Sequence, residues 1–490
     1  MSRHIPPTGS RSTTLHDLRI AQDLSQQELA DRINDQVSAV GVPGIGVTAN
    51  AISRWERGIV MPGPFYRRAL AQYFGITVPE LGLALVREQN DRPPAPVHPA
   101  DRRPAAENDV DPDPRVARSQ DHWRQTRRAL NAQRPALTQL AATVYEPHLR
   151  TLDAGLLAHP NWLPAEPVDL DSIELVYQPD AAPPELDGAG PESAHVRPQA
   201  SLVRRYQRYT QAIRDLDHPR LFENRFSWRL TTLDWLSGAG RMTFVPTTYF
   251  AAVDMYEAVA HEMAYVHLTE NGSVGPGRPV KRNLPLRKLI GDPFDLGRRT
   301  VLPSIDTLTI RRDGADASFV LHQRDARSVA VAGGMLQVIP SGVFQPSSVL
   351  PGSLETDFSL WRNMMREYSE ELLGNAEHDG DGAPVRYGDE PFAWFDRARR
   401  DGRIRVWCLG VAVDALTLVG EILTVAVFDA DTFDELAKDI VDVNDEGSIV
   451  NIRVPFTAAG IADVLDGQGM APGGAGCIRL AWTHRDRLLS

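Results

Sequence analysis

Three glutamates near residue 370 have a spacing that could hold a metal ion. Glu367, Glu370 and Glu371 stand at i, i+3 and i+4 in "LWRNMMREYSEELLGN" (360–375), so a helix would place them on one face. Carboxylates crowded together repel each other unless a divalent cation such as Mg²⁺, or neighbouring arginines, neutralises them. The pattern therefore predicts Glu367, Glu370 and Glu371 as metal and ligand-binding residues.

The same stretch also fits an ordinary amphipathic helix. In this alternative, Arg366 and Glu370 form an i,i+4 ion pair on the surface. The buried stripe would then consist of Leu360, Met364, Tyr368 and Leu372.

A second stretch, "TANAISRWERG" (48–58), has the spacing of a helix with one apolar face. Ile52, Trp55 and Ile59 recur at helical intervals, and the polar side chains fall on the other faces. Asn suits adenine and Arg suits guanine, because each can make paired hydrogen bonds to the base edge. The stretch could therefore enter a DNA groove, or it could belong to a helical bundle used only for protein contacts.

The sequence on both sides of this stretch favours DNA binding over a bundle used only for protein contacts. Ser25 and Glu28 form a predicted capping box in "LRIAQDLSQQELA", and "ALAQYFGITVPEL" supplies further short helices. Over residues 15–83 the ordered motifs resemble the XRE (Cro/C1-type) helix-turn-helix family. The resemblance implies DNA contacts by Gln26, Thr48, Ala49, Asn50, Ser53 and Arg54. It also implies a structural ion pair between Arg19 and Glu56. The chain departs from the family by an insertion at 34–46.

Composition predicts a multidomain chain. With 490 residues, two or three domains are expected. We predict a DNA-binding domain over 11–88, a Pro-rich linker over 89–118, a helical region over 119–305 with a loop insertion near 178–198, and an α+β domain over 306–490. The net charge of −12 makes non-specific attraction to DNA weak, so we expect a homodimer on a two-fold operator. Two cysteines and no long apolar run indicate a cytoplasmic protein without a membrane partner.

The last region resembles a second family. "REYSEELLG", after "VAVAGGMLQVIPSGVFQPSS", is similar to the core of the Nudix box, which in that family holds Mg²⁺ against a nucleoside diphosphate. Phe358 stands where the box has a further Glu, and Gly374 comes one place late. The expected fold class is thus an all-α helix-turn-helix domain followed by a degenerate Nudix-like α+β domain with a helical lead-in.

These inferences predict a transcriptional regulator. The N-terminal part would bind double-stranded operator DNA, and the C-terminal part would dimerise and sense a nucleotide-type small molecule, with no catalytic residue assigned. Two alternatives stay open: a Mg²⁺-dependent nucleoside-diphosphate hydrolase that carries a DNA-binding module, and a C-terminal half that serves only for assembly.

Overall fold

The computed structural model describes most of the chain from residue 113 onward and parts of the N-terminal segment. The gaps after residue 113 are 151, 153–154, 219–221, 270–271, 276–282, 325–334, 349–350, 376–383, 439, 441–446 and 468. Before it, the described residues are 15–38 without 23, then 47, 52, 55–56, 62, 64–77 and 81.

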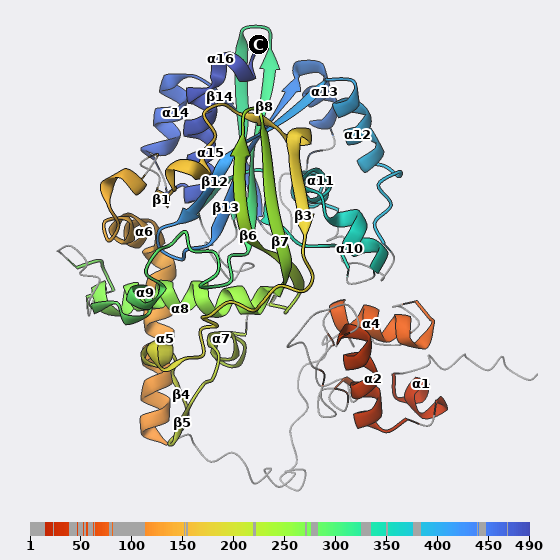
Figure 1. Cartoon of the computed structure of the whole chain (residues 1–490), viewed down its shortest axis with the longest axis vertical. Helices are drawn as coiled ribbons and strands as arrows, with labels where there is room; N and C mark the ends of the chain where they lie inside the picture. The colour runs from red at the N-terminus through yellow and green to blue at the C-terminus, as the bar shows by residue number, and fades with distance from the viewer. Residues whose placement is uncertain are drawn as a thin grey trace, which may run out of the picture.

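The described part of the N-terminal segment is mainly helical. Its helices are α1 (Leu15–Ala21), α2 (Gln26–Ser38) and α4 (Pro64–Phe74). Figure 1 shows them grouped together, away from the large sheet. Helix α2 continues into the predicted insertion at 34–46 and ends at Ser38.

A curled sheet of nine strands forms the centre of the rest of the chain. Its main path runs β1 (Leu156–Leu157), β12 (Ile404–Asp414), β13 (Gly420–Asp429), β8 (Pro303–Asp313), β9 (Asp316–Arg324) and β10 (Leu336–Val338). Three strands pair beside this path: β2 (Val168–Asp169) on β12, β11 (Ser341–Val343) on β8, and β14 (Gly447–Pro455) on β9. The β13–β8 pair is parallel and the other pairs are antiparallel.

Helices cover both faces of this sheet (Figure 1). One face carries α14 (Ala458–Leu465), α15 (Pro472–Thr483) and α16 (Arg485–Leu488); the other carries α10 (Pro351–Asp357), α11 (Leu360–Glu367), α12 (Phe392–Arg400) and α13 (Ala430–Leu436). Strand β13 is apolar on both sides for this reason. Ile422, Ala426 and Phe428 join one core, whereas Leu423, Val425 and Val427 join the other.

A smaller layer contains two minor sheets and several helices. Strands β3 (Ile173–Tyr177), β7 (Ala239–Thr248) and β6 (Phe226–Leu236) form one sheet, and β4 (Gln199–Ser201) pairs with β5 (Arg204–Arg205). The helices are α5 (Pro114–Ala132), α6 (Arg134–Ala142), α7 (Tyr209–Leu216), α8 (Tyr249–His267) and α9 (Pro285–Ile290). Short 3-10 turns complete it: η3 (Pro147–Leu149), η5 (Pro160–Trp162), η6 (Leu170–Ser172) and η7 (Pro191–Val196).

The predicted fold class is wrong. Instead of an all-α domain followed by a helical lead-in and a Nudix-like α+β domain, the described chain is mixed α/β around the curled sheet. Strands β1 and β2 come from the region predicted to be helical, yet they pair with β12 of the C-terminal region. The sheet therefore crosses the boundary predicted at residues 305 and 306.

The error in the helical region has a physical cause at strand β6. From Thr231 to Leu236 the side chains alternate between half-buried and exposed, which is the period of a strand. Gly238 then turns the chain into β7 with a positive φ of 74°, which favours glycine. In the part of the chain that the structure describes, no helix is long and apolar enough to cross a membrane.

Candidate functional site

The described N-terminal helices bury the apolar face predicted for them. Ile52 and Trp55 are buried together with Leu15, Leu29 and Ile33. Trp55 also lies against Tyr66 of α4, with ring centroids 5.3 Å apart. The side of the short stretch that carries Ile52 and Trp55 therefore belongs to the core.

A buried ion pair joins the first helix to this stretch. Arg19 Nη2 donates to Glu56 Oε2 at 3.0 Å, Arg19 Nη1 donates to the Leu24 carbonyl at 2.6 Å, and Gln26 Nε2 donates to Glu56 Oε2 at 2.8 Å. Burial alone would raise the pKa of Glu56, but hydrogen bonds from Arg19, Gln26 and His16 outweigh it and lower that pKa. The predicted Arg19–Glu56 pair is confirmed as a fold-holding contact.

The structure places only one of the predicted DNA-binding residues. Gln26 lies at the start of α2, where it braces Glu56. The remaining residues of this set, Thr48, Ala49, Asn50, Ser53 and Arg54, lie outside the described residues. Their contact with DNA stays a prediction.

Local hydrogen bonds fix the ends of α2. The Ser25 backbone N–H donates to Glu28 at 2.8 Å, and the Glu28 N–H donates to Ser25 Oγ at 3.1 Å, so the predicted capping box is confirmed. Further along, Asn34 exchanges two hydrogen bonds with the backbone of Val47, at 2.6 and 2.9 Å. The two ends of the insertion are thus held together.

The three glutamates lie on α11 and on the π-helical turn η9 (Tyr368–Leu372) that follows it. Glu371 is buried and accepts the Ser341 backbone N–H at 3.1 Å, while Glu367 lies against Gly342, where a Cβ atom would clash with it. Both therefore face strand β11. Glu370 is half-buried.

The apolar side of this helix agrees with the simpler interpretation. Its predicted stripe is buried throughout: Leu360, Met364, Tyr368 and Leu372. Arg366 is also buried and donates to Tyr387, Gln345 and Asn363, so the predicted surface pair with Glu370 is wrong. Among the described residues, no group of three or more His, Cys, Asp or Glu side chains could hold a metal ion.

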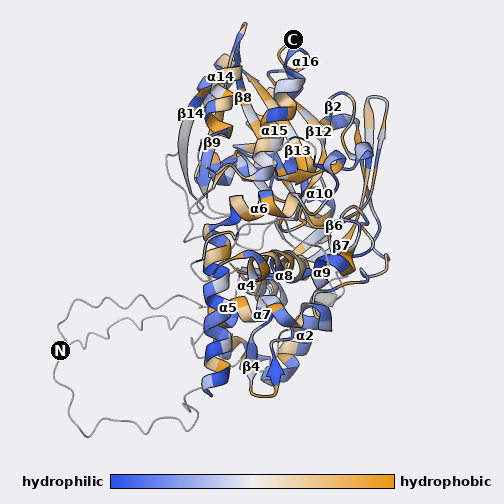
Figure 2. Ribbon diagram, turned by 90° about the vertical axis from the view of Figure 1, so that its left-hand side faces the viewer, coloured by the Kyte–Doolittle hydropathy of each residue, from blue (hydrophilic) through white to orange (hydrophobic). Residues whose placement is uncertain are grey.

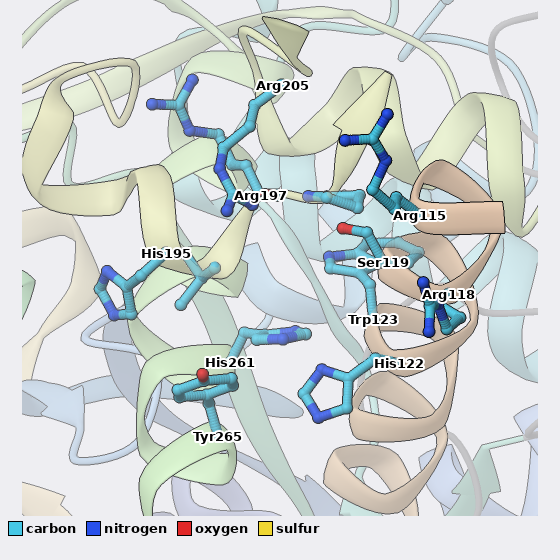
Figure 3. A pocket seen from close by; sticks show the side chains of 12 residues that line it. Arg115, Arg118, Ser119, His122, Trp123, His195, Arg197, Arg205, His261 and Tyr265 are labelled. Carbon is cyan, nitrogen blue, oxygen red and sulfur yellow. Dashed lines mark hydrogen bonds between the residues drawn. The ribbon is translucent and has the colours of Figure 1, made fainter. Parts of the chain in front are cut away.

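A basic cavity lies elsewhere, between α5 and α8. Its volume is about 380 Å³. Figure 3 shows that side chains from α5, from α8 and from the segment 195–205 point toward one space. The lining residues are Arg115, Arg118, Ser119, His122, Trp123, His195, Val196, Arg197, Pro198, Arg205, His261 and Tyr265.

The floor of the cavity is buried and aromatic. Trp123 and His261, each 2% exposed, stack with centroids 6.1 Å apart, and His261 Nδ1 is 2.8 Å from the Tyr209 hydroxyl. Burial, followed by the charge of Arg127, lowers the pKa of His261 to about 3. The imidazole is therefore neutral at pH 7, and the Trp123 indole N–H has no hydrogen-bond acceptor among the described atoms.

The arginines of the cavity interact mainly with backbone carbonyls. Arg197 is 7% exposed and donates to the carbonyls of Ala189, Gly190, Ser193, Tyr206 and Gln207, at 2.6 to 3.4 Å. Arg118 donates to Pro114 and Arg205 to the Arg197 carbonyl. Within the part of the chain that the structure describes, Arg115 is the one arginine of the cavity that pairs with a carboxylate, that of Asp113 at 3.2 Å. Burial lowers the pKa of Arg197.

A second basic cluster contains Arg127 near the end of α5 and Arg134 at the start of α6. Arg127 and Arg134 both donate to the buried carboxylate of Glu257 on α8, with Arg134 Nη2 at 2.7 Å, and Arg127 also binds Asp217 at 2.5 Å. Burial would lower the pKa of Arg127, but the carboxylate of Glu257 outweighs it and raises that pKa. These cations are neutralised inside the protein.

The sequence interpretation missed the cavity, although α5 carried a signal. Arg115, Arg118, Ser119 and His122 stand at i, i+3, i+4 and i+7, which makes a polar stripe on one helix face. The first two fell in the segment predicted as a linker, but α5 begins at Pro114. Residues 195–198 were placed in or beside a loop insertion, and they line the cavity instead.

Comparisons with known proteins identify no relative of this chain. No protein-family model matches the chain, and no curated protein matches it.

Proposed function

We propose that the protein is a sequence-specific DNA-binding regulator. Residues 15–81 would bind double-stranded operator DNA, two copies would occupy a two-fold site, and residues 113–490 would dimerise and sense a small ligand. The short stretch 48–58 would supply the base contacts.

One observation carries this proposal. The buried side of the stretch, with Ile52, Trp55 and Glu56, is held by the core and by Arg19. Helical spacing assigns Asn50, Ser53 and Arg54 to its other sides. Those residue types are suited to base edges and phosphates, and the motif order of the XRE family supports the same assignment.

The hydrolase alternative has no comparable support. It depends on carboxylates that hold a metal ion, whereas Glu371 already accepts a backbone N–H of β11, and no metal-binding group of three or more such side chains occurs among the described residues. We therefore advance no second function.

Selection of bound fragments from a random DNA pool by the full-length protein tests the proposal. We expect an enriched sequence with two-fold symmetry. Asn50→Ala and Arg54→Ala should each weaken binding to it by about 1–3 kcal/mol, that is, roughly tenfold to a hundredfold. Arg241→Gln, an exposed substitution on β7, is the matched control and should bind normally. Equal recovery of all sequences would refute the proposal.

A further inference from the structure

We propose that the cavity between α5 and α8 is a binding site for a small molecule that carries a phosphate group. The claim concerns a part of the chain separate from the DNA-binding stretch. It depends on the charge balance of the lining, on an unused donor in its floor, and on the rigidity of its wall.

The charge balance of the lining calls for an anion. Four arginines line the cavity, and no described lining residue is Asp or Glu. Two carboxylates lie next to the lining, Asp113 at Arg115 and Glu262 at 3.4 Å from His195, and burial keeps His261 neutral. Among the described residues, no carboxylate forms an ion pair with Arg118 or Arg205, whereas Arg197 is influenced by the carboxylates of Asp254 and Glu192. This excess of positive groups occurs in a chain of net charge −12. A multiply charged anion would neutralise several of them at once.

The floor offers a donor that the protein leaves without an acceptor. The Trp123 indole N–H is buried, lines the cavity and has no partner among the described atoms. A buried donor without an acceptor is costly, and indole can only donate. The missing partner must therefore be an acceptor, as a phosphate oxygen is.

The wall is already held in place before any ligand binds. Five backbone carbonyls between residues 189 and 207 accept hydrogen bonds from Arg197. This fixes the segment that carries His195 and Arg205. A preformed cavity loses little conformational entropy on binding, which favours a small ligand.

Size and depth favour a small molecule over a nucleic acid. A volume of about 380 Å³ lies in the range of small-molecule pockets. Trp123 and His261 form a recessed floor, whereas Arg115, Arg118 and Arg205 are exposed around it. These three arginines form the rim of the cavity and would bind the phosphate group of the ligand. The floor would contact the rest of the ligand.

The position of the cavity suggests how a bound ligand could regulate DNA binding. This point rests on the proposed function. Arg115 and Arg118 lie in the first turns of α5, which begins directly after residues 82–112 join it to the N-terminal segment. A ligand that ties these arginines to Arg205 would fix the start of α5. Figure 2 shows α5, mostly hydrophilic, along the edge of the molecule, with α8 beside it.

Titration calorimetry on the full-length protein tests the site. The probes are inorganic phosphate, pyrophosphate, a nucleoside monophosphate and, as a carboxylate anion, citrate. We compare the wild type with Trp123→Phe, which keeps the ring and removes the N–H, and with the double variant Arg118→Gln/Arg205→Gln. Arg241→Gln, which breaks an exposed pair with Glu174, is the matched control.

We expect at least one phosphate probe to bind once per chain. Trp123→Phe should weaken it by about tenfold and the double variant by more, because each loses charge-assisted hydrogen bonds. The control should bind as the wild type does. The rim variant keeps the test decisive if Trp123→Phe fails to fold, since both arginines are exposed.

Three results would overturn the inference: no heat with any phosphate probe at millimolar concentration, binding of citrate alone, or equal binding by the rim variant. Binding of DNA in place of the small probes, lost in the rim variant, would show a nucleic-acid surface and overturn it too. A protein that binds the probe in the cavity but no DNA refutes the proposed function and leaves this site standing.

Discussion

Two basic clusters beside helices α5 and α8 differ in how their charge is balanced. Arg127 and Arg134 share the carboxylate of Glu257, so this cluster is complete within the protein. Arg118 near the start of α5 and Arg205 on β5 line the cavity, and neither has such a partner among the described residues. The comparison teaches that paired cations stabilise the fold, whereas unpaired cations around a cavity indicate a ligand.

The largest expected effect is on the paired cluster. Glu257→Gln removes the carboxylate that both arginines share, so the buried guanidinium group of Arg134 loses its ion pair and Arg127 keeps only Asp217. This change should lower the free energy of unfolding by about 3–5 kcal/mol. Urea unfolding measures the change. Glu174→Gln, which breaks the exposed pair with Arg241, is the control and should change it by under about 1 kcal/mol. Similar losses in both variants would break the comparison.

The next largest effect is expected on the pH dependence of the unfolding free energy, through His261, which lies between the two clusters. The folded pKa of about 3 lies below the unfolded value of 6.5, so only the unfolded chain takes up this proton as the pH falls below 6.5. The wild type should lose up to about 1.4 kcal/mol per pH unit from this group.

His261→Asn should therefore gain stability relative to the wild type as the pH falls from 7 to 4. Burial raises the pKa of Asp254 to about 6, which acts in the opposite sense, but it is common to both proteins and cancels in the difference. Unfolding free energies at a series of pH values measure it. A difference that stays constant across this range would contradict the buried, neutral imidazole.

Arg197 is an intermediate case, because it is buried and hydrogen-bonded to five carbonyls but forms no ion pair within the described residues. Arg197→Lys keeps the charge and loses the planar group that reaches five carbonyls, so we expect a loss of about 1–3 kcal/mol. Limited proteolysis should detect opening of residues 189–207. An unchanged cleavage pattern and unchanged stability would show that these contacts do not hold the wall.

The smallest effect is expected for the rim of the cavity. Arg118→Gln and Arg205→Gln should each change the unfolding free energy by less than about 0.5 kcal/mol, since neither side chain is paired or buried. Thermal unfolding in chloride buffer measures this. A large loss in either variant would place these arginines in the fold and not in a binding site.

Local features of the sequence predicted local structure well. Ser25 and Glu28 form the expected cap, and Leu360, Met364, Tyr368 and Leu372 form the expected buried stripe. Such features depend on neighbouring residues. The Arg19–Glu56 pair spans 37 positions and was predicted only through the family resemblance.

The parts that the sequence did not predict depend on distant contacts. Arg127 and Glu257 are 130 positions apart, and the cavity joins α5, α8 and a Pro- and Gly-rich segment that looks like a loop. Conversely, the three glutamates on one face suggested a metal site, but Glu371 already has a partner on β11. Residue type and spacing do not reveal which polar groups are already satisfied by the fold.

Mapping of the DNA bound by the protein in its own cells tests the regulator account most directly. The account predicts a small set of sites that share one two-fold sequence, and loss of these sites when both Asn50 and Arg54 are replaced by Ala. Recovery of no enriched sequence by the wild type, or an unchanged set of sites with the double variant, would contradict it.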